Sequence, residues 1–258
     1  MDFLHITSRD NAIIKQINAL RSSAKTRRQE GLFVLEGLRI SSDACDNGVG
    51  ISVLAVSERG FSKYKNEILR IKEKAEKCCL LSDSVFKKIS ETENPQGVIT
   101  VCRIPLKNKK ISPKKRYIGL ENLQDPANLG AVARTAEALG TGGIVLTSNG
   151  CDPYSPKALR ASMGTLLRMP LYFTNDIIGF AGENGLRTVA CVVTPDADDI
   201  KDFSFADGDL LLIGNEGNGL TESTKDGADA RITVKMHGRV ESLNAAAAAA
   251  IALWEMCG

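Results

Sequence analysis

Arg134 interrupts a predicted helix whose other periodic residues are apolar. The apolar positions recur at helical spacing: Leu129, Val132, Ala133, Ala136 and Leu139. Asp125 is a suitable cap for the start of this helix, and Gly140 can end it. A guanidinium inside an apolar helix is costly unless it meets an anion, so we expect Arg134 to contact a phosphate or ribose of a ligand. Pairing with Glu121 or Glu137 is the structural alternative.

A glycine-rich segment, GNEGNG at residues 214–219, places Glu216 between a predicted strand and a helical segment. It does not match the G-x-G-x-x-G pattern of dinucleotide-binding folds, and it lies near the end of the chain instead of after the first strand. The chain has no G-x-x-x-x-G-K-[ST] phosphate loop and no Ser, His and Asp set typical of hydrolases. With two histidines, seven scattered cysteines and no Cys-x-x-Cys pair, we expect neither a metal site nor a complete disulfide framework.

The net charge of +2 conceals two oppositely charged halves. Residues 1–116 contain 23 Lys plus Arg against 13 Asp plus Glu, a net of +10, and the remaining residues contain 10 against 18, a net of −8. The run CRIPLKNKKISPKKR, at residues 102–116, has seven basic residues, two prolines and no acidic residue, which is typical of a linker. A basic half beside a basic linker favours a polyanionic partner such as RNA or DNA, and a solvated linker with no partner is the alternative.

The elements that must position these residues differ between the halves. In the first half, predicted strands at 33–37, 51–57 and 96–102 and helices at 38–46, 63–77 and 83–89 indicate a small α/β unit. In the second half, predicted strands at 117–120, 143–147, 188–193, 209–214 and 231–235 alternate with helical or loop stretches, which indicates a parallel sheet covered on both faces.

The length of 258 residues favours two modest domains. We expect a substrate-binding domain at 1–105, a basic linker at 106–116 and a larger α/β domain at 117–258. No apolar run approaches the ~20 residues of a membrane helix, and the start, MDFLHITSRD, lacks the pattern of a signal peptide. We therefore expect a cytoplasmic protein without a membrane partner.

Three segments of the second half together resemble a known family. LENLQDPANLGAVARTAEALG (120–140), LLLIGNEGNGL (210–220) and VESLNAAAAAAIALWE (240–255) are similar to the three ordered motifs of the SpoU, or TrmH-like, RNA ribose 2'-O-methyltransferases of the SPOUT class. SPKALRASMG (155–164) resembles the segment that these enzymes carry between the first two motifs. Two further segments, 26–40 and 89–102, are similar to their N-terminal substrate-binding domain, so the resemblance covers nearly the whole chain.

This resemblance implies a fold and an activity. It implies a C-terminal parallel-sheet domain with a trefoil knot, and a smaller N-terminal α/β domain that resembles an RNA-binding ribosomal protein. The implied reaction is methylation of a ribose 2'-hydroxyl in RNA by S-adenosylmethionine (AdoMet), with ribosomal RNA favoured as the substrate. It also implies a homodimer formed through the C-terminal domain. A tRNA ribose methyltransferase and a catalytically silent RNA-binding module stay open as alternatives.

The family motifs also imply the site residues. Five positions match the family's catalytic residues: Asn128, Arg134, Glu216, Ser242 and Asn244. By its place before the alanine-rich segment, Ser242 would also suit the N-cap of the last helix. Backbone groups of Gly214, Val234 and Leu243 are implied to bind the cofactor. Lys235 departs from the family pattern, since it stands where a proline is common and would bring a charge to the rim of the adenine pocket.

Overall fold

The computed structural model describes residues 3–105 and 110–258, which form two compact units. The first unit contains residues 1–106 and 154–167, and the second contains residues 107–153 and 168–258. Residues 106–109 of the expected linker lie outside the described residues. The rest of that segment, 110–116, contains neither helix nor strand.

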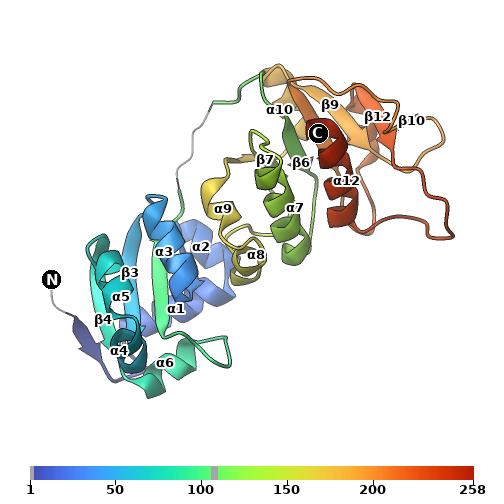
Figure 1. Ribbon diagram of the computed structural model, residues 1–258. Helices are drawn as coiled ribbons and strands as arrows, with labels where there is room; N and C mark the ends of the chain where they lie inside the picture. The colour runs from blue at the N-terminus through green and yellow to red at the C-terminus, as the bar shows by residue number, and fades with distance from the viewer. Residues whose placement is uncertain (1–2, 106–109) are drawn as a thin grey trace. The chain divides into compact units, whose positions relative to one another are not determined.

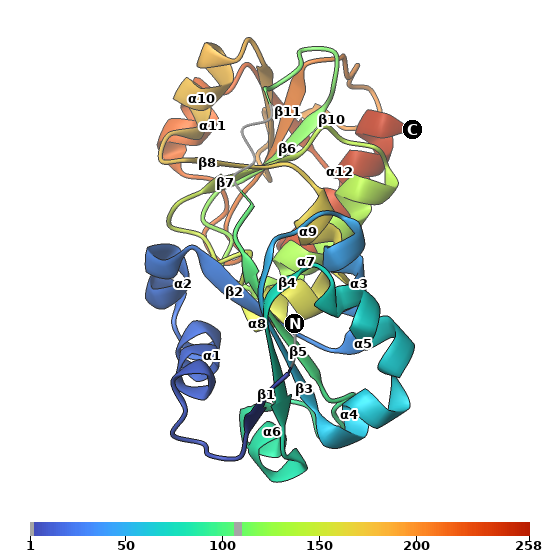
Figure 2. The same cartoon turned by 90° about the vertical axis from the view of Figure 1, so that its left-hand side faces the viewer.

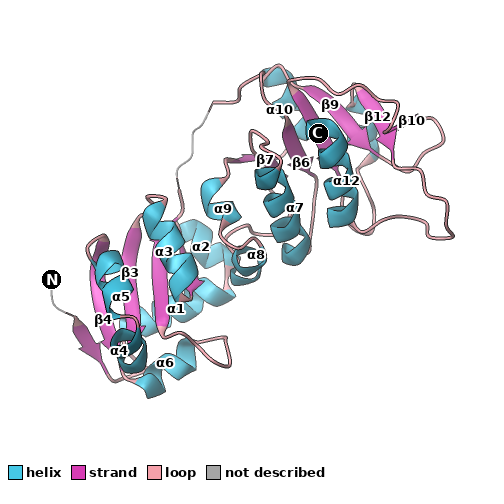
Figure 3. Cartoon of the chain, viewed as in Figure 1, coloured by secondary structure: helices cyan, strands magenta, loops and turns pink. Residues whose placement is uncertain are grey.

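The first unit is built on a five-stranded mixed sheet (Figures 1 and 3). Its strand order is β1 (Leu4–Ile6), β4 (Ala75–Leu81), β3 (Ile51–Ser57), β5 (Val98–Arg103) and β2 (Leu32–Glu36). The first three are parallel, and β5 runs antiparallel to both of its neighbours. The helices are α1 (Ala12–Ser22), α2 (Ala24–Glu30), α3 (Leu38–Asp46), α4 (Glu58–Lys63), α5 (Lys65–Lys72), α6 (Asp83–Ile89) and, from the second half of the chain, α8 (Pro156–Ala161).

The core of this unit follows from the apolar faces of these elements. Ile14, Ile17 and Leu20 of α1 and Phe86 of α6 pack with the inward residues of the sheet. The predicted strands and the helices at 38–46 and 83–89 are confirmed within a few residues, and the helix expected at 63–77 is confirmed only over α5. Its end is wrong: β4 begins at Ala75, because Cys79 and Leu81 are buried between two neighbouring strands. Strand pairing has overridden the helical preference of the charged segment.

The second unit is built on a sheet of seven parallel strands, which confirms the predicted α/β class. The strand order is β10 (Asp198–Asp199), β12 (Ala230–Thr233), β9 (Arg187–Cys191), β11 (Asp209–Ile213), β6 (Tyr117–Leu120), β7 (Ile144–Thr147) and β8 (Leu171–Thr174). All five predicted strands are present, and the sequence pattern does not predict β8 or β10. The helices are α7 (Pro126–Ala138), α9 (Thr165–Arg168, which spans the boundary between the units), α10 (Ile177–Glu183), α11 (Glu222–Gly227) and α12 (Ala245–Cys257).

Helices cover both faces of this sheet, as the sequence predicts. Figure 2 shows α10 and α11 on one side and α7 and α12 on the other. The alanine-rich α12 packs closely on α7 and β11 because its side chains are small. Gly119 of β6 also permits close packing, since a Cβ there would lie 2.7 Å from Ile177 Cδ1. None of the helices in the described ranges is long and apolar enough to cross a membrane.

Candidate active site

The three sequence motifs meet at one edge of the seven-stranded sheet. They follow β6, β11 and β12, which are parallel strands of one sheet. Because the carboxyl ends of parallel strands lie on the same side, the loops that leave them converge. This edge is the usual place for a ligand in an open α/β sheet.

Asn128, Glu216 and Asn244 form a hydrogen-bonded chain across the three motifs. The amide of Asn128 donates to Glu216 Oε1 at 3.0 Å, and the amide of Asn244 donates to Asn128 Oδ1 at 3.2 Å. Asn128 is buried on α7, so its polar groups depend on these partners. The three residues expected from separate motifs are therefore brought together.

Glu216 also binds the backbone at the start of α7. Its Oε2 accepts the Gln124 N–H at 3.0 Å, and its Oε1 accepts the Asp125 N–H at 2.9 Å. Burial raises the pKa of Glu216, but the hydrogen bonds from Gln124, Asn128 and Asp125 outweigh burial and lower it below its ordinary value. The carboxylate is thus anionic at neutral pH and ties the glycine-rich loop to the first motif.

Asn244, and not Ser242, is the N-cap of α12. Asn244 Oδ1 accepts the N–H groups of Ala246 and Ala247 at 2.9 and 3.3 Å. The capping role expected of Ser242 is therefore wrong, because the helix begins at Ala245 and the cap is the residue directly before it. Ser242 is exposed and lines the cavity described below.

Arg134 lies apart from these residues. It is six positions beyond Asn128 on α7, which is about 9 Å along the helix axis, and it is exposed. The burial expected for Arg134 is wrong, because it lies off the buried stripe of Leu129, Val132 and Ala133. Neither alternative partner is used: Glu121 bonds Thr221 and Thr224, and Glu137 pairs with Arg168.

Within residues 3–105 and 110–258, no hydrogen bond or ion pair involves Arg134. Its guanidinium is therefore open to a ligand that approaches from solvent. A phosphate or a sugar oxygen can therefore bind this arginine without first displacing a protein group from it.

A cavity of about 260 Å³ opens beside this network, between the ends of β9, β11 and β12 and the start of α12. Gly214, Val234 and Leu243, the three expected cofactor positions, all line it. Its volume is close to the lower end of small-molecule sites, roughly 300–1,000 Å³. The apolar part of its wall includes Val192, Ile213, Leu220, Val234, Met236 and Leu243.

Gly214 is required by the loop itself. A Cβ at Gly214 would lie 2.1 Å from the carbonyl carbon of Gly219, because Asn215 and Gly219 exchange two backbone hydrogen bonds of 2.9 Å that close the loop. Asn215 Oδ1 also accepts the N–H groups of Gly217 and Asn218. The loop is therefore a closed turn, and only glycine fits at position 214.

The donor set of the cavity suits AdoMet. Apolar walls can hold an adenine ring, and the N–H and C=O groups of three converging loops can bind its polar edge. Lys235 does not place its charge in the cavity, because its ammonium pairs with Asp199 Oδ2 at 3.0 Å and Lys235 is not among the lining residues. Among the described residues, no group of three or more His, Cys, Asp or Glu is arranged to hold a metal.

Glu121 supports the site in a way that the sequence does not predict, since the sequence indicates it only as a partner of Arg134. It directly follows β6 and accepts hydrogen bonds from the N–H and Oγ1 of Thr221 at 2.8 and 2.9 Å and from Thr224 Oγ1 at 2.6 Å. These bonds fix the start of α11, which directly follows the glycine-rich loop. An acidic residue directly after an apolar strand is the signal that could have identified it.

Comparison with known proteins agrees with this geometry. Residues 115–254 match the SpoU rRNA Methylase family, and residues 11–100 match the MRM3-like substrate binding domain. The 23S rRNA (uridine(2479)-2'-O)-methyltransferase of Streptomyces viridochromogenes is 30% identical over 97% of this chain and 90% of its own. RlmP of Bacillus subtilis, a 23S rRNA (guanosine(2553)-2'-O)-methyltransferase, is 29% identical over 98% and 99%.

Solved structures give the same result. The AdoMet-bound rRNA methyltransferase from Sinorhizobium meliloti superimposes with a TM-score of 0.86 and 30% sequence identity. The match covers 98% of this chain and 96% of that protein. Both units of the present chain therefore have counterparts in a protein that holds AdoMet.

Proposed function

The chain belongs to the SpoU rRNA methylase family, and we propose on this premise that it transfers a methyl group from AdoMet to a ribose 2'-hydroxyl of ribosomal RNA. The proposal rests on the cavity beside the network of Asn128, Glu216 and Asn244. Gly214, Val234 and Leu243, the three expected cofactor positions, all line this cavity. AdoMet, when bound there, supplies an activated methyl group on a sulfonium.

The chain's own task is to position the hydroxyl and to help it lose its proton. A guanidinium stays protonated in proteins, so Arg134 is a poor general base. We assign it instead to orienting the 2'-hydroxyl and stabilising the developing alkoxide, and we assign the proton to a phosphate of the RNA or to water. The exposure of Arg134 supports this role, since an RNA substrate arrives from solvent.

Asn128, Glu216 and Asn244 have a different task. Their hydrogen bonds tie the start of α7, the glycine-rich loop and the start of α12 to one another. This fixes two walls of the cavity before the cofactor binds, so less conformational entropy is lost on binding. We assign Ser242 to the rim of the cavity, where its hydroxyl can contact cofactor or ribose.

Ribosomal RNA is favoured over tRNA by two observations. Two relatives that align along nearly the whole chain are named as 23S rRNA 2'-O-methyltransferases. The first 116 residues also carry the net charge of +10, which supports an RNA-binding role for the N-terminal unit and the basic segment after it. We divide the chain accordingly into a substrate-binding domain at 1–105, a linker at 106–116 and a knotted catalytic domain at 117–258, in the cytoplasm.

A homodimer through the second unit completes the proposal. The side chains of Ile251 and Trp254 on α12 are 39% and 64% exposed, so this helix presents apolar surface. A second copy of the chain that covers α12 would bury this surface.

The test is methyl transfer from tritiated AdoMet to unmodified transcripts of 23S rRNA, 16S rRNA and tRNA. Label in 23S rRNA alone is the expected result, with Arg134→Ala as the inactive control. Label in tRNA alone would make the protein a tRNA enzyme. RNA binding without any label would make it a catalytically silent module.

A further inference from the structure

A second hollow lies in the N-terminal unit, away from the cofactor cavity. It has a volume of about 630 Å³ and is enclosed by α4, α6 and the loop at residues 93–96. We call it the α4–α6 groove. Lys63, Lys87, Tyr64 and Asn94 are among its lining residues.

The groove carries a net charge of +1, because Arg59, Lys63 and Lys87 line it together with two acidic residues, Asp83 and Glu93. Arg59 pairs with Asp83 at 3.0 Å, so these two charges offset each other. Lys63 and Lys87 are exposed, and no ion pair involves either of them in the described part of the chain. The ammonium of Lys63 lies 5.2 Å from the centre of the Tyr64 ring. Lys63, beside the Tyr64 ring, and Lys87 are therefore available to a ligand.

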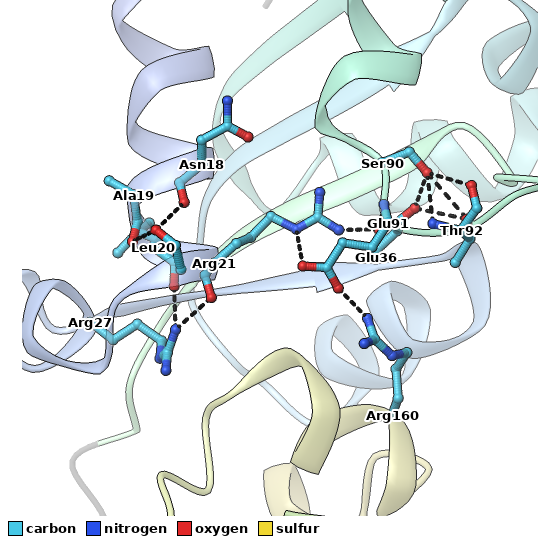
Figure 4. A network of polar contacts seen from close by, with 11 residues as sticks. Asn18, Ala19, Leu20, Arg21, Arg27, Glu36, Ser90, Glu91, Thr92 and Arg160 are labelled. Atoms are coloured by element: carbon cyan, nitrogen blue, oxygen red, sulfur yellow. Dashed lines mark hydrogen bonds and ion pairs between the residues drawn. The ribbon is translucent and has the colours of Figure 1, made fainter.

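The loop that forms one wall is held in place by a buried carboxylate (Figure 4). Glu36 accepts hydrogen bonds from the Glu91 N–H at 3.0 Å and from Thr92 Oγ1 at 2.9 Å. Arg21 pairs with Glu36, and Arg160 of α8 donates to Glu91 Oε2 at 2.7 Å. The residues just before the groove loop are thus anchored from α1, β2 and α8.

The other end of the loop, at Gln96 and Gly97, is also held in place. Gly97 has a φ of +78°, and a Cβ there would lie 2.3 Å from Ser57 Oγ. Gln96 Oε1 accepts the Leu38 N–H at 2.8 Å. Because both ends are fixed, a ligand that enters the groove does not have to order the loop first, which lowers the entropy cost of binding.

We propose that the α4–α6 groove binds an unpaired stretch of the substrate RNA, with Lys63 and Lys87 on its phosphates. The proposal rests on the proposed function, which makes RNA the substrate. Unpaired nucleotides splay their bases into pockets, where aromatic rings stack on them and amides such as that of Asn94 bond their edges. A paired A-form helix offers a wide, shallow minor groove that does not fill a concave site.

The test compares two charge-reversed forms of the full-length protein. Lys63→Glu with Lys87→Glu alters the groove. Lys15→Glu with Lys25→Glu, at exposed positions on α1 and α2, makes the same change in charge elsewhere in the unit. Fluorescence anisotropy measures binding to a labelled stem-loop RNA and to a fully paired duplex of equal length, over a range of salt concentrations.

Two single-strand phosphate contacts contribute about 1.4 to the slope of log affinity against log salt. The groove variant should show a salt slope about 1.4 smaller than that of wild type. If the two proteins bind the stem-loop equally at 1 M salt, the variant should then bind it roughly 14-fold more weakly at 0.15 M salt. The control variant should stay close to wild type, and both should bind AdoMet normally. Asn94→Ala should weaken stem-loop binding without changing the slope.

Equal RNA affinity of the groove and control variants would overturn the proposal. So would an equal loss for duplex and stem-loop, which would exclude an unpaired occupant. Intact RNA affinity with lost binding to ribosomal particles would assign the groove to a ribosomal protein. These outcomes differ from failure of the proposed function, which would be a wild-type protein that binds no AdoMet.

Discussion

Replacing Glu216 by glutamine tests whether the hydrogen-bonded network holds the site together. The carboxylate accepts hydrogen bonds from Gln124, Asp125 and Asn128 at 2.9–3.0 Å and a longer one from Asn215 Nδ2 at 3.5 Å. A glutamine oxygen in the place of Oε1 can keep two of them. Its NH2 group then faces two donors, the Gln124 N–H and the more distant Asn215 amide, so the short charge-assisted bond from Gln124 is lost.

The expected cost follows from that single bond. A hydrogen bond to a charged group contributes about 1.5–3 kcal/mol when buried, and the exposure of Glu216 lets water replace part of it, so we expect about 1 kcal/mol. For a domain of this size, that lowers the Tm by about 2–4 °C. Thermal unfolding followed by circular dichroism at neutral pH measures it.

Glu222→Gln is the matched control. It makes the same chemical change in the same unit, but the Glu222 side chain is 82% exposed and pairs with Lys225 on the surface. The control should have a Tm close to that of wild type, because an exposed ion pair contributes little to stability. Equal Tm values for Glu216→Gln, the control and wild type would refute the role of the network.

The pH dependence gives a second check on Glu216. Its pKa is lowered in the folded state from the ordinary value of 4.5. The charged network therefore contributes its full stability above pH 4.5, and this contribution is lost as the pH falls through the lower folded pKa. The difference in stability between wild type and Glu216→Gln should shrink only below pH 4.5, and a difference that shrinks between neutral pH and 4.5 would contradict the assignment.

Four further outcomes are expected. Arg134→Ala should abolish methyl transfer and change the free energy of unfolding by less than about 0.5 kcal/mol, since Arg134 is exposed; wild-type turnover would remove it from the mechanism. Gly214→Ala should lower both Tm and AdoMet affinity, because its Cβ would meet Gly219 at 2.1 Å; an unchanged variant would contradict the closed loop. Calorimetry should detect AdoMet binding with excess chelator present, and binding that requires a divalent ion would contradict the donor set. Light scattering should give about twice the 27.7 kDa chain mass, and Trp254→Ala should shift it toward one chain; a fully active wild-type monomer would refute the dimer.

Local signals made part of the fold predictable. The start of α7 follows from Asp125 as the cap and Pro126 in the first turn, and Gly140, with a φ of +75°, stands just beyond its end. Three of the five predicted strands of the second unit, β6, β7 and β11, are short, largely apolar runs that are buried along their whole length. Such elements are determined by residues that are close in sequence.

Other features depend on contacts that the sequence does not display. The charged segment before β4 has helical character, and only its pairing with β1 and β3 makes the following residues a strand. Asn128 meets Glu216 and Asn244 from 88 and 116 residues away. Family resemblance placed all three residues at the site, but not their mutual hydrogen bonds.

Arg134 shows the limit of periodicity as a guide to burial. An apolar stripe along α7 predicts which positions face the sheet, but it does not tell whether the remaining positions meet solvent or protein. In the structure Arg134 meets solvent, so the burial expected for it is wrong, and its contact with substrate stays a prediction.

The central claim is that this protein methylates a ribose 2'-hydroxyl of ribosomal RNA. A 2'-O-methyl group blocks alkaline cleavage of the adjacent phosphodiester, so mapping protected positions in total RNA from cells with and without the protein tests the claim directly. We predict one position in 23S rRNA that is protected only when the protein is present and loses protection with Arg134→Ala. Identical protection in both RNA samples, or a methyl group on a base in place of the ribose, would contradict it.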